Sequence, residues 1–110
     1  MKNYRILFAT LLFLGASLGS SAADGKATWD EHCAKCHGAD AKGDTKMGKK
    51  LKIADLSDAK VQAGFTDEDA AKAIKEGKAD KNGKVVMKAI EGLSDDDIKA
   101  VIAHLRTLKQ

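Results

Sequence analysis

The sequence contains no proline, only two cysteines, and few aromatic residues, which make up 5% of the 110 positions. The single tyrosine and two of the three phenylalanines lie within the first 13 positions, so the rest of the chain has only Trp29 and Phe65 to fill an interior. A chain of this length forms one domain, and so small a domain often needs a disulfide, a metal or a cofactor for stability. The composition therefore predicts a single domain whose interior contains an embedded cofactor.

The first 23 residues have the pattern of a secretory signal. Lys2 and Arg5 form a positive start, residues 6–18 are an almost unbroken apolar run, and residues 19–23 are small. We predict a cleaved signal peptide over residues 1–22, a mature domain over residues 23–110, and export to a bacterial periplasm. The alternative is an uncleaved membrane anchor, but the apolar run is shorter than the about 20 residues that span a bilayer.

The charge balance gives no indication of nucleic-acid binding. The whole chain has 19 Lys and Arg residues and 16 Asp and Glu residues, for a net charge of +3. Loss of Lys2 and Arg5 with the signal leaves 17 basic residues against 16 acids, which is a net charge of +1. We therefore expect no nucleic-acid partner, and after cleavage we expect no stable membrane insertion.

The two cysteines form the sequence's most specific motif. Cys33 and Cys36 are three positions apart, and His37 follows at once. Cys-x-x-Cys-His is the attachment motif for c-type haem. Residues at i and i+3 share one helical face, so both thiols can reach the two vinyl groups on one haem edge, and the adjacent imidazole can bind the iron. The alternatives are a redox disulfide, a structural disulfide, and a zinc site that would include His32.

The remaining pattern predicts helices joined by glycine-containing loops. We expect four helices: residues 24–36, a short one over 57–63, residues 66–76, and a terminal helix that starts at 94. Between them we expect a polar loop over 38–52 and a loop over 78–88 with a turn at 82–83. Ser57, Thr66 and Ser94 are the predicted N-caps, and acids follow the last two. The terminal helix presents one continuous apolar face: Ile98, Val101, Ile102, Leu105 and Leu108.

These features together resemble the class I c-type cytochromes over essentially the whole chain beyond the signal. The residues that carry the resemblance are Gly25, Trp29, Cys33, Cys36, His37, Gly38, Met87, Leu93 and the terminal sequence at 105–108. The resemblance implies an all-α cytochrome c fold, with three main helices and short helices wrapped around one covalently bound haem c. It also implies His/Met ligation of the iron and electron shuttling between larger redox proteins.

Carried over by position, the resemblance assigns Cys33 and Cys36 to the thioether bonds, His37 to the proximal iron ligand and Met87 to the distal ligand. It places Gly25 and Trp29 of the first helix in contact with the terminal helix. Where many relatives have a tyrosine in the terminal helix this chain has His104, which we expect at the helix crossing. Relatives often have a proline carbonyl that accepts the ring N–H of the proximal histidine, and the lack of proline leaves that acceptor open.

Three other side chains are alternatives for the distal position: Met47, His32 and His104. Met47 lies only ten residues after His37, which is a short distance for the chain to cross to the other haem face. His32 adjoins Cys33 and is expected at the surface, and His104 is expected to pack against its neighbours. Met87 lies late in the chain, just before the terminal helix, and its thioether suits haem iron.

The predicted function is that of a monomeric, periplasmic single-electron carrier without enzymatic activity. Six lysines against three acids at 42–60, and six against two at 72–88, predict a positive docking face for redox partners if both segments flank the haem edge. An ordinary solvated surface is the alternative reading of these lysines. The functional alternatives are a haem enzyme or gas sensor with an open distal site, and the cytochrome subunit of a larger oxidoreductase.

Overall fold

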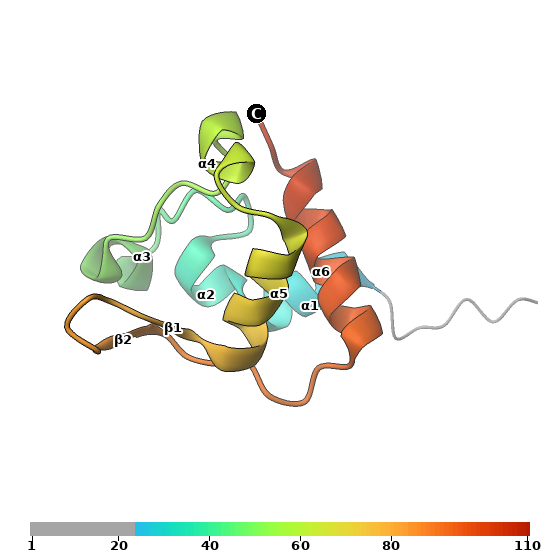
Figure 1. The fold of residues 1–110 in the computed structure, drawn as a ribbon. Coiled ribbons are helices and arrows are strands. Elements are labelled where there is room, and N and C mark those ends of the chain that lie inside the picture. Colours follow the sequence, from blue (N-terminus) through green and yellow to red (C-terminus); the bar gives the residue numbers. More distant parts are fainter. Residues whose placement is uncertain (1–23) are drawn as a thin grey trace, which may run out of the picture.

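The computed structural model describes residues 24–110 as a helical domain with one small β-hairpin (Figure 1). The predicted signal peptide lies outside the described residues. The elements in chain order are α1 (Gly25–His32), α2 (Ala34–His37), α3 (Lys46–Leu51), α4 (Ala59–Ala63), α5 (Asp67–Glu76), β1 (Lys78–Ala79), β2 (Val85–Met87) and α6 (Asp95–Thr107). The predicted helical class is confirmed, with the hairpin as an addition.

The crossing of α1 and α6 organises the domain. Gly25 lies so close to α6 that a Cβ atom added to it would stand 2.1 Å from the carbonyl oxygen of Ala100. One turn further along α1, the ring of Trp29 is 3% exposed and lies 6.2 Å, centroid to centroid, from the ring of His104. The predicted contacts of Gly25 and Trp29 with the terminal helix, and the predicted place of His104, are therefore confirmed.

The two longest helices of the structure, α5 and α6, begin where the sequence places them. Thr66 before α5 and Ser94 before α6 each form a reciprocal capping box, with Asp69 and Asp97 as the respective partners. These caps satisfy backbone N–H groups that have no acceptor within the helix. One face of α6 is buried, through Ile98, Val101, Ile102 and Leu105, and α5 packs beside it.

The predicted first helix is divided at Cys33. This residue ends α1 with a φ of −113°, and its N–H donates to the Trp29 carbonyl at 2.8 Å. A second short helix, α2, follows, and Gly38 ends it at a φ of 86°. The break separates the helix that crosses α6 from the short segment that carries Cys36 and His37.

The prediction of a plain loop over residues 38–52 is wrong, because this segment contains α3. The Thr45 hydroxyl caps α3 by accepting from the Gly48 N–H. Gly48 has a low intrinsic helix propensity, but it lies inside α3, where a Cβ atom would stand 2.7 Å from the Cys36 carbonyl oxygen. The short helix predicted from Ser57 also differs in its start, since the side chain of Asp58 caps α4.

The prediction of a loop over residues 78–88 is also wrong, because β1 and β2 pair there as an antiparallel hairpin. Lys78 pairs with Met87 and Ala79 with Val85, across an irregularity in register. The turn falls at the predicted Asn82–Gly83, where the Asp80 carboxylate accepts the N–H groups of Asn82 and Lys84. These local hydrogen bonds favour a paired hairpin over an irregular loop.

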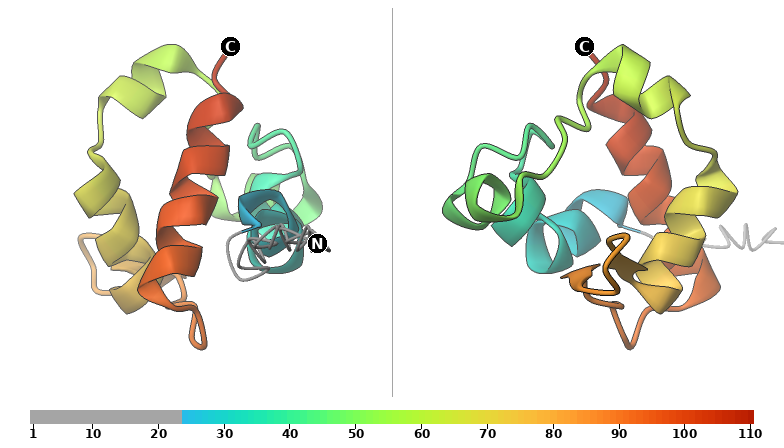
Figure 2. Two further views of the ribbon diagram at one scale, coloured as in Figure 1. Left: turned by 90° about the vertical axis from the view of Figure 1, so that its right-hand side faces the viewer. Right: turned by 60° about the vertical axis from the view of Figure 1, so that its left-hand side comes forward.

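Two parts of the chain form the side of the domain away from α6. Figures 1 and 2 show that one part is α2 with α3 and that the other is the β-hairpin. Among residues 24–110, no helix is both long and apolar enough to cross a membrane. The fold thus places the segment with Cys36 and His37 and the strand with Met87 on the same side of the domain.

Candidate haem-binding site

Cys33 and Cys36 are free thiols in the described structure. Cys33 is buried, and burial, with a smaller contribution from the neighbouring Cys36, raises the pKa of its thiol to about 11. Cys33 is therefore a neutral thiol at pH 7. The two thiols form neither a redox disulfide nor a structural disulfide among these residues.

The imidazole of His37 is held neutral and close to Trp29. Burial lowers the pKa of His37 below its usual value, and the two ring centroids are 5.7 Å apart. Its Nδ1 atom is buried and has no hydrogen-bond partner among residues 24–110. Neutral imidazole is the form that binds metals. The acceptor that the sequence left open is not supplied by the part of the chain that the structure describes.

Three successive backbone carbonyls, at residues 36–38, each accept a hydrogen bond from a different part of the chain. The donors, in order, are the Thr45 hydroxyl at 2.6 Å, the Gly43 N–H at 2.7 Å and the Trp29 indole N–H at 2.9 Å. These bonds fix the backbone around the histidine without a proline. Sequence reasoning missed the role of Thr45, although a threonine directly before Lys46 and Met47, two good helix formers, is an N-cap signal.

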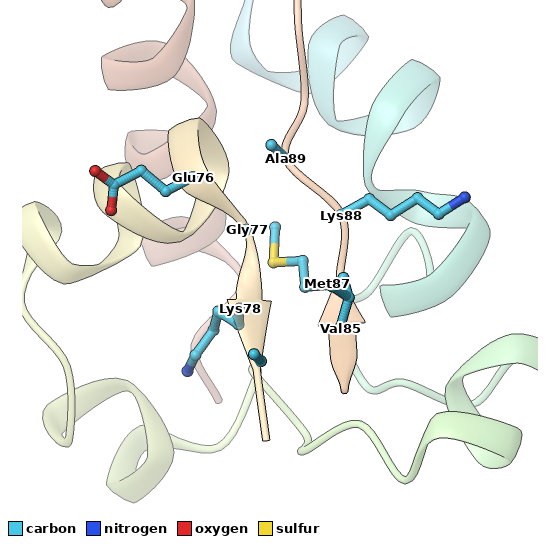
Figure 3. Close-up of a pocket in the computed structure, with 8 residues that line it drawn as sticks. Glu76, Gly77, Lys78, Val85, Met87, Lys88 and Ala89 are labelled. Atoms are coloured by element: carbon cyan, nitrogen blue, oxygen red, sulfur yellow. The ribbon is translucent and has the colours of Figure 1, made fainter. Parts of the chain in front are cut away.

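Met87 lies on β2 with its side chain half-buried and packed against the hydrophobic core, which includes Cys33 and Trp29. Figure 3 shows its thioether turned toward Gly77 across the hairpin, while the side chains of Glu76 and Lys88 point away. The hollow at this place has a volume of about 440 Å³. Met87 therefore places a soft thioether sulfur on the face of the hairpin that packs against the core.

The other side chains considered as ligands are placed differently. Met47 lies in α3 and is half-buried, His32 is exposed at the end of α1, and His104 packs at the helix crossing. No three His, Cys, Asp or Glu side chains within residues 24–110 are grouped so that they could bind a metal together. The zinc site that would have included His32 has no support in this geometry.

The groups present fit a covalently attached haem. Two free thiols, a neutral imidazole and a thioether are the groups that thioether attachment and His/Met ligation require. The core is also small: its eight buried hydrophobic residues include a single aromatic, Trp29. A flat apolar macrocycle suits an interior with so few large side chains.

Comparisons with known proteins agree with this chemistry. The cytochrome c family profile matches residues 22–109. Cytochrome c-554(547) of Halothiobacillus neapolitanus is 33% identical over 91 residues, which cover 80% of this chain and 97% of that protein. Among solved structures, the KustC0563 c-type cytochrome superposes with a TM-score of 0.66 at 28% identity, over 79% of this chain and 99% of that one. A point mutant of the same cytochrome gives a TM-score of 0.63 at 29% identity, over 78% and 99% of the two chains. The chain therefore belongs to the cytochrome c family, and it is an electron-transfer protein with covalently bound haem c.

Proposed function

We propose that this protein is a periplasmic single-electron carrier whose haem is attached through Cys33 and Cys36 and ligated by His37 and Met87. The observation that carries the proposal is the position of the Met87 thioether, which is turned inward on the hairpin and packs against the core that contains Cys33. When bound, the haem supplies one-electron Fe(III)/Fe(II) chemistry. The protein's residues attach it, ligate it and shield it from water.

The proposed ligand pair favours a carrier over an enzyme. If His37 and Met87 both bound the haem iron, no position would remain for a substrate. The thioether also raises the reduction potential relative to a harder ligand. The His37 ring is already neutral, and the half-buried Met87 thioether is uncharged. Neither group would therefore have to change its charge in order to bind the iron.

The periplasmic location rests on the predicted signal peptide over residues 1–22, with residues 23–110 as the mature domain. Edman sequencing of the purified mature protein tests it directly: a first residue of Ala23 supports cleavage after Ala22. A protein that keeps Met1 contradicts the assignment.

A lysine-rich docking face is the second part of the proposal. Lysines of the hairpin, at 78, 81, 84 and 88, form no ion pair with any carboxylate among residues 24–110, whereas Lys72 and Lys75 of α5 pair with Glu76 and Asp95. The hairpin lies on the same side of the domain as α3, which carries further lysines. Uncompensated charge of one sign speeds encounter with an oppositely charged partner.

The ligand assignment is tested with Met87→Ala. The variant is expected to lose the weak long-wavelength absorption band of sulfur–iron ligation in the oxidised protein and to bind carbon monoxide rapidly when reduced. The haem is expected to stay covalently attached. Met47→Ala is the matched control and should keep the band. A Met87→Ala protein with an unchanged spectrum would show that another group is the distal ligand.

The docking face is tested with hexacyanoferrate, a small anionic oxidant, by stopped-flow kinetics. Lys84→Glu on the hairpin and Lys99→Glu on α6 change the net charge equally. We expect a larger rate decrease for Lys84→Glu than for Lys99→Glu, and we expect the rate of the unmodified protein to fall as ionic strength rises. Equal effects of the two variants would contradict a hairpin-centred docking face.

A further inference from the structure

Gly77 occupies an unusual position between the end of α5 and the start of β1. Its N–H donates to the Ala73 carbonyl at 2.8 Å, which closes the last turn of α5. Its φ of 78° and ψ of −178° fall in a region that is essentially restricted to glycine. This backbone conformation turns the chain from the helix into the hairpin.

The strand that carries Met87 lies directly against Gly77. A Cβ atom added to Gly77 would stand 2.6 Å from the Met87 carbonyl oxygen and 2.9 Å from the Ala89 nitrogen. Both atoms belong to the backbone, so no side-chain rotation relieves the overlap. Gly83 and Gly92 have similar φ values of 80° and 83°, but an added Cβ meets nothing within 4 Å at either position.

The backbone around Met87 is held on both sides of this contact. Met87 pairs with Lys78 in the hairpin, and the Ile90 N–H donates to the Ile74 carbonyl of α5 at 2.8 Å. Ile74 itself is buried in the core. Because α5 is anchored through Ile74, a side chain at position 77 displaces the Met87 strand more readily than it displaces the helix.

From this geometry we infer that Gly77 is a positioning residue for the distal ligand. The missing side chain lets the Met87 backbone lie against the end of α5, and this contact sets where the thioether stands. Figure 3 shows the Met87 side chain reaching toward Gly77 from the neighbouring strand. The inference rests on the proposed role of Met87 as the distal ligand.

The test compares Gly77→Ala with Gly83→Ala in the oxidised holoprotein. Imidazole added to the solution competes with the methionine for the iron, so its apparent affinity measures how firmly Met87 is held. Steric overlap of the added Cβ atom with the Met87 and Ala89 backbone predicts an about fivefold to hundredfold rise in apparent imidazole affinity for Gly77→Ala. Gly83→Ala shares the positive φ without the overlap, and it should change the affinity by less than about twofold. Equal affinities for the two variants would overturn the inference.

A second measurement covers the case in which Gly77→Ala does not fold. In the unmodified holoprotein, two-dimensional NMR is expected to show a strong nuclear Overhauser effect between the Gly77 Hα protons and the Ala89 amide proton. Its absence would contradict the close approach.

Met87→Ala separates the ligand role of Met87 from the positioning role of Gly77. If Met87→Ala keeps the sulfur–iron band, the ligand assignment fails. If it loses the band while Gly77→Ala behaves like Gly83→Ala, only the positioning role fails.

Discussion

Replacement of Gly25 by alanine tests the helix crossing that organises the domain. Helix propensity alone predicts that alanine stabilises α1 by about 0.5–1 kcal/mol relative to glycine. The structure predicts the opposite sign. The added methyl carbon would stand 2.1 Å from the Ala100 carbonyl oxygen, 2.6 Å from its carbonyl carbon and 3.1 Å from the His104 Cβ atom.

The size of the effect follows from these distances. Nonbonded heavy atoms are most stable about 3.5–4.0 Å apart, so α1 and α6 would have to separate by roughly 1 Å or more. Overpacking of this kind typically costs about 1–3 kcal/mol. With the gain in propensity subtracted, we expect Gly25→Ala to lower the free energy of unfolding by about 1–2 kcal/mol, which lowers the melting temperature of a domain this size by about 4–16 °C.

The assay is thermal unfolding of the holoprotein, followed by far-ultraviolet circular dichroism. Gly64→Ala is the matched control, because Gly64 has helical dihedral angles (φ −81°, ψ −6°) and an added Cβ would come no closer than 3.3 Å to another atom. This control should leave the melting temperature unchanged or raise it. A Gly25→Ala protein as stable as the unmodified one would refute the close approach of α1 to α6.

Two further substitutions test contacts that hold the ligand segment and the terminal helix. Trp29→Phe keeps an aromatic ring but removes the N–H that donates to the Gly38 carbonyl at 2.9 Å, and it should lower the free energy of urea unfolding by about 1 kcal/mol. No loss of stability would mean that this bond contributes nothing. Arg106→Lys should cost about 1–3 kcal/mol in the same assay, because the guanidinium donates at once to the carbonyls of Gln62 and Phe65 and to Asp67. Equal stability of the lysine variant would show that a single charge is sufficient there.

Local signals explain why the long helices could be predicted from the sequence. The capping boxes at Thr66 and Ser94 are formed by residues three apart, so no distant contact is needed to define them. The apolar spacing of α6 likewise defines its buried face. The crossing partners Gly25 and Trp29 were predictable only because the whole pattern resembles a known family.

The elements that were missed depend on contacts between distant residues. Gly48 breaks a helix by intrinsic propensity, yet α3 includes it because the close approach of the Cys36 backbone requires glycine there. The hairpin depends on the pairing of Lys78 with Met87, and one short apolar run could not define that register. The contacts of Arg106 with residues about 40 positions earlier in the chain gave no signal in the sequence.

The residues of the candidate site divide in the same way, into those that a local motif indicates and those that depend on distant contacts. The Cys-x-x-Cys-His motif is contiguous, so Cys33, Cys36 and His37 can be proposed as haem-binding residues without a fold. The assignment of Met87 rests on its order in the chain and on ligand chemistry, and it stays a prediction. The hydrogen bond from Thr45 to the Cys36 carbonyl, at 2.6 Å, became visible only once the chain had been folded.

The most direct test of the account is the visible absorption spectrum of the protein purified from the periplasm, oxidised and then reduced. A carrier with His37 and Met87 as ligands should show sharp bands of low-spin c-type haem after reduction and the weak sulfur–iron band before it. A high-spin spectrum would mean an open iron and would contradict the carrier mechanism in favour of a haem enzyme or gas sensor. A protein without haem, made with intact maturation machinery, would contradict the account as a whole.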